Sequence, residues 1–493
     1  FGGTGKYDCG PYKGRIYYAP SITIFSSRGP NPIAPDIIKP DVTAPGIQIL
    51  AGNSPFPSPE FVPGELFQAI AGTSMSSPHV AGLFALLKQA HPEWSAAAAR
   101  SALMTTTYQR VRDNDRVSPA DPFDMGAGHV NFNSPVDRVG SVFNPGLIYD
   151  AGYLDYLGFL CDIYPAIFAN PSGTCALLEA LGVQTKAYNL NYPSIGVANV
   201  PGERIVERTI TSVAEKRTIF KSIVQAPPGY TVQVTPWYVE LDPGESATVQ
   251  IKITNDGTAP IGEWRFGSLT WVGQGNKVYS PIAVRGALFE APAEVLGEDA
   301  SGSTSFNINF GYTGSYTAGN HGLIPATVTS DTVVQDPDQN FDPNDGYSNA
   351  HTFNLSGAAF FRIVLPPWAA EANSDLDIYV FDPNGNEVAS STSGGTDEQV
   401  DIEAPMDGTW TVYVHGWSAP GGDTDYDMFT WAIPQATGGS LNIDAAPASA
   451  VAGASGTVAV SWSGLSSGWY LGAVSHTGDS GPMGMTLVNV DVP

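Results

Sequence analysis

The sequence has few cysteines, few basic residues and no long apolar run. Its 493 residues include three cysteines and 22 Lys and Arg against 48 Asp and Glu, which gives a net charge of −26. A surface this acidic repels phosphate backbones and anionic lipid headgroups, so nucleic acid and membrane surfaces are poor partners. No stretch reaches the roughly 18 to 20 apolar residues of a membrane span, and the best short run is Val80 to Leu87. We therefore expect a soluble protein.

Charged residues are also scarce, at 14% of the chain, whereas apolar residues make up 42%. This balance excludes a disordered chain. The 54 Gly, 40 Pro, 21 Tyr and 22 Phe favour turn-rich β structure with more strand than helix. At roughly 100 to 200 residues per domain, the length predicts three or four domains.

The chain begins at Phe1 without an initiator Met and without the basic-then-apolar order of a signal peptide, so we expect a processed or partial product. The odd number of cysteines leaves one partner elsewhere if the protein is secreted. Cys161 and Cys175 could close a short loop, and the alternative is two free buried thiols.

Helical spacing is confined to the first third. Apolar residues recur there at i, i+3, i+4 and i+7, and a second helix is expected from just after Pro92 to about Met104. The apolar positions are Val80, Leu83, Phe84 and Leu87.

From about Leu190 onward, alternating strands separated by Gly-, Pro- and Asn-rich turns predict successive β-sandwiches. Examples are Tyr230 to Val234, Thr248 to Thr254 and Thr409 to His415. The acidic segment from Asp336 to Asp345 is expected to be a boundary or linker between two of these sandwiches.

The stretch with the most specific chemistry is residues 72–82, GTSMSSPHVAG. A serine placed where a turn leads into a helix is exposed, and the free N–H groups of the first helical turn stabilise negative charge beside it. Gly72 allows close approach of a substrate carbonyl, and Pro78 is expected in the first turn, where its missing N–H costs little. This arrangement suits a serine nucleophile at Ser74; the alternative is a buried or capping serine.

Residues 72–82 closely resemble the nucleophile motif of the subtilisin-like serine proteases. Residues 25–31 (FSSRGPN) and 39–46 (KPDVTAPG) match the segment that precedes it in that family. Residues 126–131 (GAGHVN) and 144–150 (NPGLIYD) resemble its continuation in the large, plant-type branch. The resemblance implies that Ser74 is the nucleophile and that its backbone N–H is one donor of the oxyanion hole.

A serine nucleophile needs a histidine base oriented by an acid, and the family carries both far upstream of the serine. None of the seven histidines stands in a His-Gly-Thr-His setting, and no Asp-Thr-Gly or Asp-Ser-Gly occurs in the N-terminal region. We therefore expect an upstream segment to supply the Asp and the His, and we expect the chain alone to be inactive. His79, on the same helix as Ser74, and His129, in a Gly-rich turn, are expected to be structural.

Residues 478–481, Gly-Asp-Ser-Gly, resemble the nucleophile tetrapeptide of the chymotrypsin-like proteases. They stand in a strand-turn-strand pattern with no matching base motif upstream. We therefore expect Ser480 to lie in a β-turn.

Further resemblances divide the chain. Residues 1–186 are expected to be the C-terminal part of a subtilisin-like α/β domain, in which residues 1–17 resemble a remnant of the protease-associated domain. Residues 187–288 resemble a fibronectin-III-like sandwich, with 289–344 as a β-rich connecting region. Residues 345–437 resemble a pre-peptidase C-terminal sandwich, and C-terminal strands follow over residues 438–493. The fold class is thus multidomain, part of an α/β subtilisin-like domain followed by all-β sandwiches.

The resemblance implies a disulfide, and the acidic residues themselves offer a candidate calcium site. Cys161 and Cys175 resemble the disulfide loop of the plant-type branch, worth roughly 3 kcal/mol in the chain-entropy model. Acids in the turns of the last third could offer oxygen ligands to Ca²⁺, and solvated turn acids are the alternative. We expect no other cofactor and no other metal. These acids are Asp336, Asp338, Asp342, Asp345, Asp375 and Asp377.

The sequence leaves two hypotheses for function. The first is a secreted, extracellular serine endopeptidase that hydrolyses peptide bonds of protein substrates through an acyl-enzyme on Ser74. The second is a catalytically incomplete fragment whose β-sandwiches act as a binding or targeting module.

Overall fold

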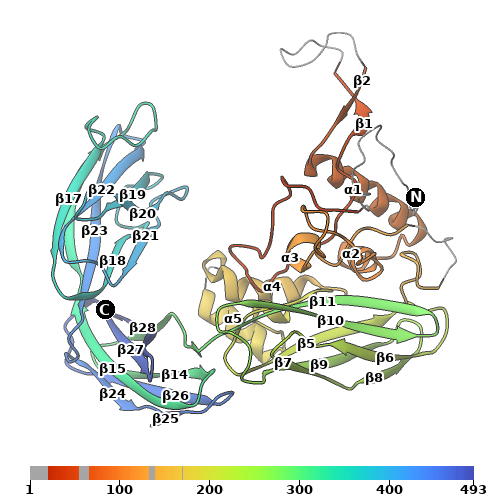
Figure 1. The fold of residues 1–493 in the computed structure, drawn as a ribbon. Helices are drawn as coiled ribbons and strands as arrows, with labels where there is room; N and C mark the ends of the chain where they lie inside the picture. Colours follow the sequence, from red (N-terminus) through yellow and green to blue (C-terminus); the bar gives the residue numbers. More distant parts are fainter. Residues whose placement is uncertain (1–19, 55–65, 133–138, 169) are drawn as a thin grey trace. The chain divides into compact units, whose positions relative to one another are not determined.

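A computed structural model describes residues 20–54, 66–132, 139–168 and 170–493 of the chain (Figure 1). The chain forms two units, Phe1–Leu288 and Phe289–Pro493, which are described one at a time. Strands dominate both units, and the helices are confined to the first, which confirms the multidomain, mostly β fold class.

Helices form the N-terminal part of the first unit. They are α1 (Thr73–Ala90), α2 (Ala96–Thr105), α3 (Pro122–Met125), α4 (Tyr153–Ile163) and α5 (Pro171–Ala180), with 3₁₀ turns at Pro165–Ile167 and Ala187–Asn189. A hairpin of β1 (Ile49–Gly52) and β2 (Phe67–Ile70) precedes α1. Both expected helices are therefore present, and α2 lies within a few residues of the expected range from just after Pro92 to about Met104.

Helices α1 and α2 differ in how well they are covered. The N-cap of α2 is Ser95, whose hydroxyl accepts the N–H of Ala98 at 2.9 Å, and most of the residues of α2 are buried. In α1, Leu87 is the one buried side chain, although the helix has 18 residues. Leu86 of α1 is 45% exposed, and Val80 is half-buried. Among the described residues, the apolar face of α1 is thus only partly covered.

A β-sandwich follows the helices. One sheet has the order β4-β11-β10-β6-β8 and the other β3-β5-β9-β7. Trp271, Phe220 and Ile251 lie fully buried between them. The strands are β3 (Leu147–Ile148), β4 (Ile195–Val200), β5 (Glu203–Ser212), β6 (Thr218–Gln225), β7 (Tyr230–Thr235), β8 (Tyr238–Leu241), β9 (Ser246–Asn255), β10 (Trp264–Gly273) and β11 (Asn276–Gly286).

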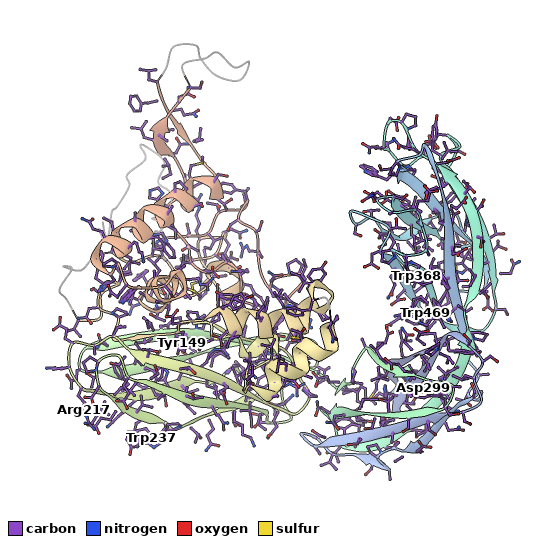
Figure 2. All side chains as sticks on the ribbon, turned by 180° about the vertical axis from the view of Figure 1, so that it is seen from behind. Tyr149, Arg217, Trp237, Asp299, Trp368 and Trp469 are labelled. Atoms are coloured by element: carbon purple, nitrogen blue, oxygen red, sulfur yellow. A yellow bond between two sulfur atoms is a disulfide. The ribbon has the colours of Figure 1, made fainter. Side chains whose placement is uncertain are left out.

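The helical part and this sandwich share a core. Phe123 of α3 packs edge-on against Trp264 and Phe266 of β10, with ring centroids 4.9 and 5.1 Å apart. Tyr149 is buried where the helices meet the sheets, and its hydroxyl accepts a hydrogen bond from Ser280 (Figure 2). Because β3 pairs with β5, a strand that precedes residue 187 completes the second sheet of the sandwich.

The second unit contains two sandwiches. The first has the sheets β16-β23-β18-β21 and β17-β22-β19-β20, and the second has β12-β14-β26-β24 and β13-β28-β27-β15-β25. The strands are β12 (Phe289–Glu290), β13 (Glu294–Glu298), β14 (Gly302–Phe310), β15 (Gly314–Pro325), β16 (Thr327–Val334), β17 (Ser348–Leu355), β18 (Ala358–Leu365), β19 (Asp375–Phe381), β20 (Glu387–Ser391), β21 (Glu398–Glu403), β22 (Gly408–Ser418), β23 (Asp423–Pro434), β24 (Leu441–Ala445), β25 (Ser449–Ala450), β26 (Ser455–Trp462), β27 (Gly468–Gly478) and β28 (Gly481–Val492).

The structure divides this unit differently from the sequence analysis. Strands from 289–325 and from 441–492 alternate within the same two sheets, so most of the expected connecting region builds one sandwich with the C-terminal strands. The rest of that region contributes β16 to the other sandwich. The expectation that Asp336 to Asp345 links two sandwiches is wrong, because this segment joins β16 to β17 of the same sandwich. Alternation shows that a strand exists, but pairing between segments more than a hundred residues apart leaves no local pattern.

Candidate functional site

Ser74 is the second residue of α1, and its side chain is exposed. None of the described residues is hydrogen-bonded to its hydroxyl. The N–H groups of the first turn have no carbonyl partner inside the helix, so they can stabilise negative charge beside Ser74. The position has the exposure and the local field that a nucleophilic serine requires.

The segment of residues 43–46 holds the turn that precedes Ser74. The Gly46 carbonyl accepts the N–H of Gly72 at 2.8 Å, and the Ser76 hydroxyl donates to the Ala44 carbonyl at 2.9 Å. A Cβ at Gly46 would lie 2.4 Å from the Ser76 Oγ, so glycine is needed for this close approach. Two motifs that lie apart in the sequence thus form one local structure around Ser74.

Pro78 does not lie where the sequence analysis placed it. Helix α1 begins at Thr73, which makes Pro78 its sixth residue rather than part of its first turn. A proline at this point has no N–H to donate to the carbonyl of Ser74, four residues earlier.

The two histidines near Ser74 make other contacts. The Nδ1 of His79 lies 2.8 Å from the Met75 carbonyl oxygen, and the Nδ1 of His129 lies 3.0 Å from the Thr43 hydroxyl. Burial, and next the nearby His79, lower the pKa of His129. Neither contact supplies Ser74 with a base.

The expected disulfide is present. Cys161 of α4 and Cys175 of α5 are bonded, with 5.7 Å between their Cα atoms. The bond links two short helices that pack against each other. Cys9 and the other residues of 1–17 lie outside the described residues.

The expected turn at Ser480 is also present. Ser480 is exposed in the two-residue connection between β27 and β28, where Gly478 pairs with Gly481. The Asp479 carboxylate is held by the Ser315 N–H at 3.2 Å and by the Ser315 hydroxyl. The tetrapeptide is a hairpin turn with no histidine bonded to it among the residues that the structure describes.

A buried cluster of charged groups lies in the second unit. The Nε2 of His415, on β22, is 3.0 Å from the carboxylate of Asp336, and its Nδ1 is 3.4 Å from the carboxylate of Asp377 on β19. Both carboxylates can receive an N–H only when the ring is protonated. Phe341, from the segment that carries Asp336, stacks on Tyr379 with ring centroids 3.8 Å apart. The segment is therefore fixed across the outer face of β19 and β22.

The sequence analysis missed His415 because β22 alternates, and the outer face of a strand is expected to be solvated. The sequence signal that could have revealed the burial of His415 is the acidic segment before β17. Whether that segment covers the histidine depends on how it folds back. Two of the acids considered for Ca²⁺, Asp336 and Asp377, bond this histidine instead. Within the described part of the chain, no group of three or more His, Cys, Asp or Glu side chains could hold a metal ion.

We predict that His415 makes the stability of the second unit depend on pH. Burial opposes the charge of His415, but its hydrogen bonds to Asp377 and Asp336 outweigh burial and raise its pKa above 6.5. A histidine with a raised pKa stabilises the fold fully below its unfolded pKa, and this contribution is lost as the pH rises through the folded pKa. The urea midpoint of the unit should therefore fall as the pH rises above about 6.5.

The control for this prediction is His415→Gln, which cannot carry the charge. At pH 6 this variant should unfold at a lower urea concentration than the original protein. At pH 9 the urea midpoints of the two proteins should lie closer together. Parallel pH profiles for the two proteins would contradict the prediction.

Comparison with known proteins gives three family matches. Residues 15–128 match the subtilase family, residues 189–284 a fibronectin type-III domain, and residues 347–416 the bacterial pre-peptidase C-terminal domain. These matches confirm the resemblances drawn from the motifs.

Two relatives and one solved structure show the extent of the similarity. The chain is 40% identical over 284 residues to the subtilisin-like protease SBT1.7 of Arabidopsis thaliana and 37% identical over 286 residues to the CO(2)-response secreted protease of the same plant. Each match covers 54% of this chain but 36% of the relative, so the chain spans about a third of their length. The crystal structure of tripeptidyl peptidase 2 aligns with 97% of this chain and 52% of that one, at 11% identity and a TM-score of 0.25. No helix among the described residues is both long and apolar enough to cross a bilayer.

Proposed function

Because the chain carries a subtilase segment followed by fibronectin type-III and pre-peptidase C-terminal segments, we propose that it is part of a secreted serine endopeptidase that cleaves proteins through an acyl-enzyme on Ser74. The observation that carries this proposal is the exposed Ser74 at the N-terminal end of α1, held by residues 43–46 inside the segment that matches the subtilases. In the proposed reaction, the Ser74 oxygen attacks the peptide carbonyl, and its own N–H is one donor to the oxyanion.

We further propose that the Asp and the His of the triad come from an upstream segment. The half-covered apolar face of α1 supports this, because uncovering several large side chains costs several kcal/mol at roughly 25 cal/mol per Å². A segment that packs on α1 would bury this face and could bring the base to Ser74. The chain also spans about a third of the length of its curated relatives.

The name of one relative, the CO(2)-response secreted protease, and the Cys161–Cys175 disulfide support secretion, because disulfides persist in oxidising compartments. The domain division that goes with this proposal assigns residues 1–186 to the catalytic part and 187–288 to the fibronectin-III-like sandwich. It assigns residues 345–437, together with β16, to the pre-peptidase C-terminal sandwich. In a second candidate function, the sandwiches act as a binding or targeting module and Ser74 is idle. The observation that favours it is that neither His79 nor His129 is bonded to Ser74.

A fluorophosphonate probe tests the proposal, since it reacts with an activated serine. We expect it to label Ser74 in the native protein extended by its own upstream sequence, and to leave Ser480 unlabelled, as mapped by peptide mass spectrometry. Ser74→Ala should abolish the labelling, and Ser480→Ala is the matched control that should preserve it. An adduct at Ser480, or an extended protein whose Ser74 stays unlabelled, would overturn the assignment.

A further inference from the structure

The charge of the chain is divided very unevenly between its two units. Residues 289–493 contain 25 Asp and Glu against a single basic residue, Arg362, which gives the second unit a formal charge of −24. Residues 1–288 contain 21 Lys and Arg against 23 Asp and Glu, a formal charge of −2. Almost the whole net charge of −26 therefore belongs to the second unit.

The one basic residue of the second unit is not available at its surface. The side chain of Arg362 is 4% exposed, and it is paired with Asp401 at 2.7 Å and with Glu294 at 2.9 Å. No other Lys or Arg occurs in the unit, all of whose residues the structure describes. Apart from Arg362, the unit thus holds no lysine or arginine that could neutralise its 25 carboxylates.

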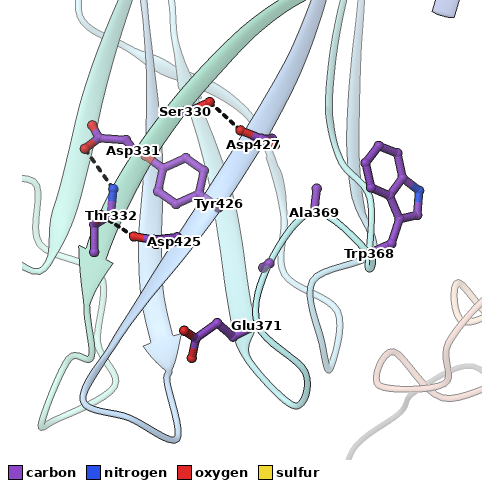
Figure 3. Close-up of a pocket in the computed structure, with 10 residues that line it drawn as sticks. Ser330, Asp331, Thr332, Trp368, Ala369, Glu371, Asp425, Tyr426 and Asp427 are labelled. Carbon is purple, nitrogen blue, oxygen red and sulfur yellow. Dashed lines mark hydrogen bonds between the residues drawn. The ribbon is translucent and has the colours of Figure 1, made fainter. Parts of the chain in front are cut away.

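Four of the carboxylates line one hollow of the unit. A hollow of about 640 Å³ on the first sandwich of the unit is lined by ten residues, four of which are acids and none of which is basic (Figure 3). Two of these acids, Asp425 and Asp427, accept hydrogen bonds from Thr332 and Ser330 of the neighbouring strand. The other two are Asp331 and Glu371.

Local hydrogen bonds keep such carboxylates ionised. The backbone N–H of Asn386 and then its side chain lower the pKa of Asp382, and the hydroxyl and N–H of Ser315 lower the pKa of Asp479. These groups do not relieve the repulsion by taking up protons near neutral pH. Like charges on a compact body destabilise it unless counter-ions screen them.

We infer that the second unit is a polyanionic module whose stability depends on ionic strength, because its carboxylates repel one another until dissolved ions screen their charge. No group of three or more metal-binding side chains exists in the unit to concentrate a cation at one point. The Debye length falls from about 30 Å at 0.01 M salt to about 8 Å at 0.15 M, so screening should act over the whole surface of the unit. The first unit, with its near-balanced charge, is the internal control.

Hydrogen exchange measured by mass spectrometry on the full chain tests the inference, because it reports each unit separately. Between about 20 and 500 mM NaCl, protection of β14, β18, β22 and β26 should rise about tenfold or more, while protection of β9 and β10 should change less than about threefold. Choline chloride should act like NaCl at equal ionic strength, since the effect is one of charge. Equal gains in both units, or no gain in the second, would overturn the inference.

A variant with four exposed carboxylates neutralised tests whether charge repulsion causes the salt dependence. At 20 mM salt its second unit should be better protected from hydrogen exchange than that of the original chain, and its protection should rise less when salt is added. The matched control exchanges Glu and Asp at the same four positions, keeps the charge, and should respond like the original chain. A neutralised variant with an unchanged response to salt would also overturn the inference. The substitutions are Glu371→Gln, Glu387→Gln, Asp397→Asn and Glu403→Gln, all at exposed positions.

Discussion

A polypeptide of residues 1–493 alone should cleave casein at least about a thousandfold more slowly than the same chain extended by the upstream segment that we propose. The physical reason is that a serine hydroxyl is a weak nucleophile without a base, and neither His79 nor His129 is hydrogen-bonded to Ser74. Without the base, only substrate binding and the electric field of the helix N-terminus are left to accelerate the reaction. Initial rates of casein hydrolysis for the two proteins at equal concentration measure the difference.

The control for this experiment is Ser74→Ala in both proteins. It should remove the activity of the extended protein and leave the rate of residues 1–493 near background. Robust cleavage by residues 1–493, abolished by Ser74→Ala, would show that the base lies within this chain and would refute the proposed upstream partner.

Replacing Arg362 by alanine should lower the free energy of unfolding of the second unit by about 3 kcal/mol or more, because it removes a buried guanidinium and leaves two partly buried carboxylates without their cation. Arg362 lies on β18, and its partners are Asp401 on β21 of the same sandwich and Glu294 on β13 of the neighbouring sandwich. Next to this network, Trp431 and Trp469 pack edge-on with ring centroids 4.8 Å apart. The substitution therefore weakens both a sandwich and its contact with the next one.

Calorimetry of the full chain should show the transition of the second unit at lower temperature and that of the first unit unchanged. The matched control is Arg265→Ala in the first unit, whose side chain is 30% exposed and pairs with Glu263, a pair worth at most about 1 kcal/mol. A loss for Arg362→Ala as small as that of the control would contradict the prediction.

Much of the local structure could be predicted from the sequence, because it depends on neighbouring residues. Apolar residues at i, i+3, i+4 and i+7 gave the helix around Leu87, and alternation gave strands such as β7, β9 and β22. The Gly-Asp-Ser-Gly tetrapeptide was predicted to be a turn from its flanking strands, and it is one. The exposed position of Ser74 follows from the turn before α1.

Other features could not be predicted because they depend on segments far apart in the chain. The position of Pro78 required the first residue of α1, and the turn before that residue is held by residues 43–46. The burial of His415 required the segment around Asp336 to fold back across β22, more than 70 residues away. The sandwich built from residues 289–325 and 441–492 could not be predicted, because both of its sheets combine strands from before and after an inserted sandwich.

The sequence by itself determined the subtilase-like motif around Ser74, the helices of the first third, the strands that follow and the excess of acids. Only the tertiary structure decided which segments share a sheet, that α1 keeps a partly covered apolar face, that Cys161 and Cys175 are bonded, and that the single arginine of the acidic unit is buried. The physical reason is range: turns, helices and alternation are set within a few residues, whereas pairing, burial and the mutual repulsion of charges depend on distances in space that the chain fixes only when it folds.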